Sequence, residues 1–401
     1  MDAGDEARTI GRRLRQIRKA RDKSLAVVAG LSGMSTATLS RIENGLRALD
    51  SRSEIVALAD ALQIAPSELT GTQENLTPDS GNKDKDDALE VVHHALTAVE
   101  LGHLDGGRVF SVDVLRERIA YVQQARRRGL FAAVGARLPA LVTDVHASIA
   151  AGRDVGEMLA LATLLHVDTV AHWLHDAGAP ELRIKAATLA RDAACEHGDR
   201  TTLAVAAWGT TVALLTDRML DLAQAELDSV VLPATTSATA GVICGLAMTQ
   251  ALVAAVDKRF GEVDAPMDTA TELAQRFDAA DDRLGYVVGP AEVDVRRMVL
   301  ALEAREPDRA VRIGDGVRPQ EISIVARKAG YWMEYGQALA RTRGRYDKAV
   351  RALRTAEQLF PERFRRNPFV QDTLAELLPR SRRDALGREL RGMAYRAGLP
   401  V

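Results

Sequence analysis

The sequence predicts an all-α protein made of two helical units. Three observations support this fold class. Apolar residues recur at helical spacing through most of the 401 residues, strand-like alternation is nearly absent, and the segment 71–87 is polar and rich in turn-forming residues. A chain of this length also exceeds the usual domain of roughly 100–200 residues, which favours two units over one.

Composition limits the functional classes. The formal charge is only -2 and 27% of the residues are charged, with both signs interspersed, so any electrostatic binding must be local. The two cysteines, Cys195 and Cys244, lie far apart and outside any CxxC motif, which is typical of a reducing compartment. The N-terminus lacks a signal-peptide pattern, and we identify no apolar run of roughly 18–20 residues that would span a bilayer. We therefore expect a cytoplasmic protein with no membrane partner.

The N-terminal unit is predicted to contain five short helices. Ile10, Leu14 and Ile17 are spaced i, i+4 and i+7, on one face of a first helix whose other faces carry arginine and lysine. Ser24 stands where it would cap a second helix and Ser35 where it would cap a third, with the turn "SGM" between the two helices.

Further signals complete this unit. Gly45 stands where a left-handed residue usually ends a helix, so it closes the third helix. The stretch 51–64, "SRSEIVALADALQI", has the spacing of a fourth amphipathic helix, and 65–71, "APSELTG", predicts a short fifth one. Because the second and third helices are joined by a three-residue turn, residues 1–70 are predicted to form a helix-turn-helix domain.

Residues 71–87, "GTQENLTPDSGNKDKDD", are predicted to form a flexible linker. They carry almost no apolar side chains, so they cannot bury enough surface to offset the entropy of ordering. Residues 88–401 follow, rich in alanine, leucine, arginine and aspartate and poor in β-branched alternation. This composition predicts a second domain that is also helical.

The helix-turn-helix segment resembles a known family. Its pattern "VAGLSGMSTATLSRIENG" resembles the signature of the Cro/repressor-type, or Xre-type, DNA-binding domain, a five-helix fold like that of lambda repressor. The resemblance implies a double-stranded DNA operator as partner. The matching residues are Val28, Ala29, Ser32, Gly33, Met34, Ser35, Leu39, Ser40, Arg41, Ile42, Glu43, Asn44 and Gly45.

The third helix is then the recognition helix, whose first turn enters the major groove. Thr36, Ala37 and Thr38 are short enough for their methyl groups to approach thymine, and the hydroxyls can bond to bases or phosphates. One turn later, Arg41 can reach guanine O6 and N7 or bind a phosphate; a solvated Arg41 is the alternative. The remaining DNA-binding candidates, expected mainly at phosphates, are Ser24, Ser40, Asn44, Arg47, Arg12 and Arg15.

The family resemblance gives Glu43 a structural role. It implies that this glutamate pairs with an arginine of the first helix, here Arg18, and holds the two helices together. The first helix also carries the basic run "RRLRQIRKARDK". Phosphate contact by part of this run is our preferred interpretation, and a merely solvated basic face is the alternative.

The second domain shows one clear repeat, "GYWMEYGQALARTRGRYDKAVRALRTAEQLFP", which resembles the tetratricopeptide pattern. Weaker copies of its turn-plus-alanine theme recur back to about residue 90, so we expect a tetratricopeptide-like α-solenoid of stacked helical hairpins. Together with the closing segment, this domain resembles a group of regulators from high-GC bacteria that join an Xre-type domain to a degenerate tetratricopeptide solenoid. The pattern-matching residues are Gly344, Tyr346, Ala349, Ala356 and Pro361.

An enzymatic second domain has little support. The segment "HVDTVAHWLHDAG" places His172 and His175 at i, i+3, which is a metal-ligand spacing, but a third ligand at helical spacing is missing. We expect these histidines to line the solenoid surface or to pack beside Trp173. There is no P-loop, no GxSxG and no GxGxxG after a strand. We predict no catalytic residue, no metal and no cofactor.

Two functional hypotheses stay open from the sequence. In the first, a transcription regulator senses a peptide or small-molecule effector in the concave face of the solenoid and changes its affinity for the operator. In the second, the solenoid serves only dimerisation or protein partners. Under both we expect a homodimer that reads two half-sites. The dimer is predicted to form mostly through the solenoid, which offers long helical faces and an end helix, "AELLPRSRRDALGRELRGMAYRAGL", with residues 71–87 tethering each DNA-binding domain.

Overall fold

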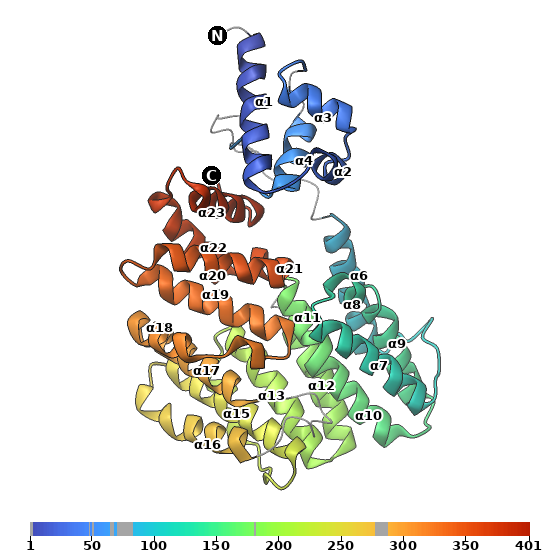
Figure 1. Cartoon of the computed structure of the whole chain (residues 1–401). Coiled ribbons are helices and arrows are strands. Elements are labelled where there is room, and N and C mark those ends of the chain that lie inside the picture. The colour runs from blue at the N-terminus through green and yellow to red at the C-terminus, as the bar shows by residue number, and fades with distance from the viewer. Residues whose placement is uncertain are drawn as a thin grey trace.

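A computed structural model describes residues 3–47, 49, 52–64, 68–69, 83–179, 182–276 and 288–401. Over these ranges every regular element is a helix, which confirms the predicted all-α class. A small N-terminal unit lies at one end of a long stack of helices (Figure 1).

The N-terminal unit has the predicted helix-turn-helix. The caps form as expected: Ser24 Oγ accepts the amide N–H of Val27 at 3.2 Å, and Ser35 Oγ accepts that of Thr38 at 3.0 Å. The two helices of the motif meet at 111°, within the usual range for it. The predicted fifth helix, 65–71, falls largely outside the described residues. The helices are α1 (Ala3–Ala20), α2 (Leu25–Leu31), α3 (Thr36–Glu43) and α4 (Arg52–Leu62).

The core of this unit follows the helical spacing seen in the sequence. Leu14, Leu39 and Leu58 are fully buried, one each from α1, α3 and α4. Gly11 permits the close approach of α1 to α3, because a Cβ at this position would lie 2.2 Å from the carbonyl oxygen of Ile42. A larger residue at position 11 would therefore push the recognition helix away from α1.

The second unit begins with helices that surround the aromatic residues Phe131 and Trp173, whose rings stack 5.0 Å apart. One helical run continues through a π-helical segment, Leu165–Val170, where an extra residue per turn widens the helix. The helices of this half are α6 (Lys83–Glu100), α7 (Val112–Arg127), α8 (Phe131–Gly135), α9 (Leu138–Ala150), α10 (Val155–Leu164), α11 (Ala171–Asp176) and α12 (Leu182–His197).

The remaining helices continue the stack. Packing is dominated by sequence neighbours, such as α12 on α13, α15 on α16, α17 on α18 and α19 on α20, which is the packing of a solenoid. Their bounds are α13 (Arg200–Thr216), α14 (Leu220–Asp228), α15 (Ser237–Val256), α16 (Asp264–Arg276), α17 (Pro290–Glu303), α18 (Pro307–Gly316), α19 (Val325–Arg341), α20 (Tyr346–Leu359), α21 (Pro361–Arg366), α22 (Pro368–Leu377) and α23 (Ala385–Arg396).

Helices α19 and α20 form the repeat predicted from the sequence. Tyr346 and Ala356 are buried, and Gly344 has a left-handed backbone (φ 74°) in the turn before α20. Gly336 allows the two helices to approach closely, since a Cβ there would lie 2.8 Å from Cδ2 of Leu353. Small residues therefore set the spacing of this hairpin, as the sequence pattern indicates.

Two expectations from the sequence are wrong. Helix α6 begins at Lys83, inside the segment 71–87 that is predicted as a linker; residues 71–82 lie outside the described ranges. Helix α15, Ser237–Val256, is an uncharged run of 20 residues, long enough to span a bilayer. It packs inside the solenoid with 67% of its most apolar window buried, so it serves here as a core helix.

The predicted dimerisation helix is also different in the structure. Its sequence is divided by a 3₁₀ turn, Leu378–Arg380, into α22 and α23. Leu390, Met393 and Ala394 of α23 are fully buried in the core of their own chain. The apolar side that was expected to meet a second subunit is therefore already covered.

Ion pairs join the N-terminal unit to the C-terminal helix of the solenoid. Arg21, at the end of α1, contacts Glu389 at 2.5 Å, and Glu68 pairs with Arg391. Burial in this contact lowers the pKa of Arg21. The N-terminal unit therefore contacts the C-terminal end of the solenoid at α23 (Figure 1).

Candidate nucleic-acid interface

The first turn of α3 presents small side chains to solvent. Thr36 and Ala37 are exposed, whereas Thr38 is half-buried. The Thr38 hydroxyl lies 2.9 Å from Ser35 Oγ and takes part in the helix cap. Thr36 and Ala37 are therefore the more accessible candidates for contact with thymine methyl groups, while Thr38 also stabilises the start of the helix.

Arg41 and Asn44 extend the exposed surface of α3 by one turn. The Arg41 guanidinium has no hydrogen-bond or ion-pair partner within the part of the chain that the structure describes. Asn44 Nδ2 donates to the carbonyl oxygen of Ser40 at 2.9 Å and to Ser40 Oγ at 3.5 Å, and because Asn44 is exposed, a phosphate oxygen can replace the longer of these contacts. Ser40 is half-buried below these two residues. This surface can bind both base edges and phosphates.

Burial divides the basic run of α1 into structural and exposed members, a division the sequence does not make. Arg13 donates to the carbonyl oxygen of Leu69 at 3.0 Å, and Lys23 donates to that of Ala61 at 2.6 Å. Both cations tie α1 to the rest of the domain and are less available to DNA. The exposed members, spaced on one face of α1, are Arg12, Arg15 and Lys19.

Arg18 and Glu43 form a two-bonded ion pair between α1 and α3. Arg18 Nε donates to Glu43 Oε1 at 2.6 Å, and a terminal nitrogen donates to Oε2 at 2.8 Å. The side chains are only 12% and 4% exposed, and the hydrogen bond to Glu43 raises the pKa of Arg18. The other terminal nitrogen donates to the carbonyl oxygen of Lys23 at 3.0 Å. This pair fixes the recognition helix against α1, in the role that the family resemblance implies.

The remaining two candidates lie at the edges of the motif. Ser24 is exposed at the start of α2, where its hydroxyl already serves as the cap. Arg47 pairs with Glu54 at 2.7 Å on the surface. An exposed pair of this kind contributes only about 0–1 kcal/mol, so a phosphate can replace Glu54 as the partner of Arg47.

The histidine-rich segment lies inside the solenoid and not on its surface. His166 Nε2 is 2.9 Å from His146 Nε2, and His172 Nδ1 is 3.1 Å from the carbonyl oxygen of Val167. Burial lowers the pKa of His172 and His166 well below the usual range and that of His146 to about 4. Within the described ranges, no group of three histidine, cysteine or acidic residues is arranged to hold a metal ion.

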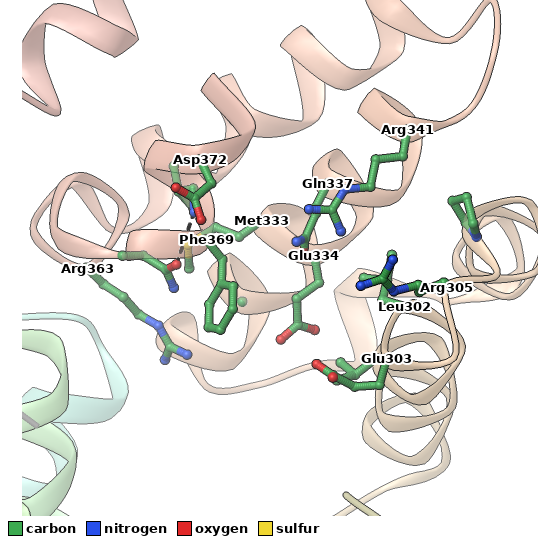
Figure 2. A pocket seen from close by; sticks show the side chains of 15 residues that line it. Leu302, Glu303, Arg305, Met333, Glu334, Gln337, Arg341, Arg363, Phe369 and Asp372 are labelled. Carbon is green, nitrogen blue, oxygen red and sulfur yellow. Dashed lines mark hydrogen bonds between the residues drawn. The ribbon is translucent and has the colours of Figure 1, made fainter. Parts of the chain in front are cut away.

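The solenoid also contains a cavity of about 660 Å³ between α17, α19 and the α21–α22 segment (Figure 2). Its volume lies within the roughly 300–1,000 Å³ of small-molecule sites. The sequence gives no motif for it, because its walls come from separate helices whose side chains meet only in the folded chain. Residues that line it include Leu302, Glu303, Arg305, Met333, Glu334, Gln337, Arg341, Arg363, Phe369 and Asp372.

Comparison with known proteins supports the N-terminal assignment. Residues 9–70 match the family model described as a helix-turn-helix domain. No curated protein matches the chain.

Two solved structures cover most of the chain at low similarity. The apo form of the competence regulator ComR from Streptococcus vestibularis is 14% identical, with a TM-score of 0.30, over 81% of this chain and 98% of that one. The PrgX/iCF10 complex is 10% identical, with a TM-score of 0.31, over 88% of this chain and 97% of that one. Structural similarity this low supports no statement about function. We assign the solenoid from the packing of helices within this chain.

Proposed function

We propose that this chain is an Xre-type transcription regulator that binds a specific double-stranded DNA operator in the cytoplasm. The observation that carries the proposal is the exposed face of α3, where Arg41 has no partner among the described residues. The Arg18–Glu43 pair holds this helix in place, and the whole motif lies inside the segment that matches a helix-turn-helix domain. Exposed cations on α1 supply a phosphate-binding face beside it.

The solenoid acts in this proposal as a sensor of a peptide or small-molecule effector. A cavity of about 660 Å³ with apolar and charged walls supports this role. The alternative is a solenoid that serves only dimerisation or protein partners, through surfaces other than the apolar side of α23, which the core of the same chain covers.

A homodimer remains part of the proposal, since one helix-turn-helix covers only half of a symmetric operator. The half-sites are expected about 10–10.5 base pairs apart, centre to centre, or at a multiple of that spacing. The dimer contact then lies outside the apolar side of α23.

Genome-wide footprinting of the sites bound by the full chain tests the function, with and without culture extract from the source cells. Regulation predicts a small set of reproducible sites whose occupancy changes with extract. Uniform binding along the genome at low salt, without reproducible sites, would show a non-specific DNA-binding protein instead.

A further inference from the structure

The cavity between α17, α19 and α22 has an apolar wall with an uncovered aromatic ring. Met333 and Val370 are buried in this wall, whereas Phe369 is 62% exposed. Phe369 and Glu334 both line the cavity (Figure 2). An aromatic ring and a carboxylate in one cavity offer an apolar surface together with groups that attract cations.

Glu334 lines this cavity, and one of its carboxylate oxygens has no hydrogen-bond partner. Its Oε2 atom is buried and accepts no hydrogen bond, and the side chain forms no ion pair with any residue the structure describes. Burial raises the pKa of Glu334 to about 7, with the Glu303 charge raising it further and the charges of Arg296 and Arg363 opposing the rise. Leaving a buried carboxylate unpaired is unfavourable, and a bound cation would relieve that penalty.

The cavity's basic residues are largely paired already. Arg341 contacts Glu376 at 3.6 Å, and Arg363 contacts Asp176 at 3.6 Å, whereas Arg305 lies exposed at the rim. The three acidic lining residues differ, because Glu303, Glu334 and Asp372 have no ion-pair partner among the described residues. Glu303 and Asp372 are exposed, as Arg305 is, so Glu334 is the acidic lining residue that is shielded from solvent, with the charges of Arg296 and Arg363 acting on it.

We propose that this cavity binds a protonated amine attached to an apolar group, with the ammonium against Glu334 and the apolar group against Phe369 and Met333. The amine belongs either to the amino terminus of a short apolar peptide or to a free aliphatic or aromatic amine. The claim that this ligand is an effector rests on the proposed function. The claim that the cavity binds it rests only on the residues that line the cavity.

A line of ion pairs leads from the cavity segment to the DNA-binding unit. Arg365 of α21 lies 3.7 Å from Glu357, which pairs with Arg354 at 3.0 Å. Arg354 contacts Glu389 at 3.3 Å, and Glu389 pairs at 2.5 Å with Arg21, which follows α1. A ligand that shifts α21 and α22 thereby acts on the contact that holds the N-terminal unit.

Calorimetric titration of the full chain tests the site with two probes, 2-phenylethylamine and a pentapeptide of apolar residues with a free amino terminus. Each probe is paired with its N-acetyl form, which has the same apolar body but no cation. We expect both free amines to bind and both N-acetyl forms to bind at least about tenfold more weakly, the loss expected for a charged hydrogen bond. The tighter of the two amines identifies the source of the ligand.

Three variants locate the binding. Glu334→Gln should weaken both amines about tenfold or more, and Phe369→Ala, at an exposed ring, should weaken them several-fold. Glu321→Gln, an exposed carboxylate outside the cavity, is the matched control and should leave binding unchanged. Thermal melting shows that each variant is folded.

The proposal is overturned if neither amine binds, if the N-acetyl forms bind equally well, or if Glu334→Gln binds the amines as the wild type does. Operator binding, measured on the same samples, separates this result from the proposed function. If the chain binds its operator but neither amine, only the proposed ligand site is contradicted. If it binds the amines but no DNA, only the proposed regulator function is contradicted.

Discussion

Replacing Glu334 with glutamine should change how the stability of the ligand-free chain depends on pH. Burial raises the pKa of Glu334 from 4.5 to about 7. Between pH 4.5 and about 7, the Glu334 carboxyl is therefore mostly protonated in the folded chain and mostly ionised in the unfolded chain. The wild type therefore loses stability as pH rises from about 4.5 to about 7, and the loss is constant above that. Glutamine cannot ionise, so the variant lacks this loss.

The size of the effect follows from the shift. At about 1.4 kcal/mol per pKa unit, the difference between 4.5 and about 7 corresponds to about 3 kcal/mol. The Glu334 side chain is half-buried and not fully enclosed, so we expect a smaller effect than this full value. Glu334→Gln should be about 2–3 kcal/mol more stable than the wild type at pH 8 and about equally stable at pH 4.5. For a domain of about 310 residues, at roughly 2 cal/mol/K of unfolding entropy per residue, that corresponds to a Tm difference of about 3–5 °C.

Differential scanning calorimetry of the full chain at a series of pH values measures this directly. The wild type is compared with Glu334→Gln at each pH, so that titration of all other groups cancels. Glu321→Gln, exposed and outside the cavity, controls for the loss of one negative charge. A Tm difference between Glu334→Gln and wild type that stays constant from pH 4.5 to 8 would refute the reasoning, because it would mean that folding does not raise the pKa of Glu334.

Other predictions concern the DNA-binding unit. Arg41→Ala should weaken operator binding by about 1–3 kcal/mol and flatten the preference at one base pair; an equal loss on all sequences, with a smaller salt slope, would make Arg41 a phosphate contact. Arg18→Ala or Glu43→Ala should each destabilise the N-terminal unit by about 3–5 kcal/mol in thermal melts, because the partner stays buried and unpaired; a shift below about 1 kcal/mol would place the pair effectively in solvent. Glu389→Gln should increase hydrogen exchange at the end of α1 around Arg21 and leave α3 unchanged; unaltered exchange at α1 would mean that this ion pair does not hold the unit in solution.

The sequence predicts the DNA-binding unit in detail because its signals are local. Ser24 and Ser35 mark two helix starts by capping chemistry, and Gly45 marks an end by its left-handed backbone, φ 69°. These features depend on a few neighbouring residues, which a sequence displays directly. The Arg18–Glu43 contact joins two helices, and only the family resemblance made it predictable.

The sequence cannot predict features that depend on which faces meet. Arg13 and Arg15 are equivalent members of one basic run, yet Arg13 bonds to the carbonyl oxygen of Leu69 whereas Arg15 is exposed. The apolar side of α23 has the pattern of an interface, but Met393 packs into its own chain. Likewise, nothing near Glu334 in sequence indicates a cavity, because the opposing walls come from helices distant along the chain.

Selection of bound sequences from random double-stranded DNA tests most directly whether α3 reads DNA sequence. With the full chain at physiological salt, we predict one enriched motif with two related half-sites about 10–10.5 base pairs apart or a multiple of that spacing. Selection with Arg41→Ala should lose the preference at one position of each half-site and keep the spacing. Recovered sequences no different from the starting pool, from a folded wild-type chain, would contradict sequence-specific DNA binding by this protein.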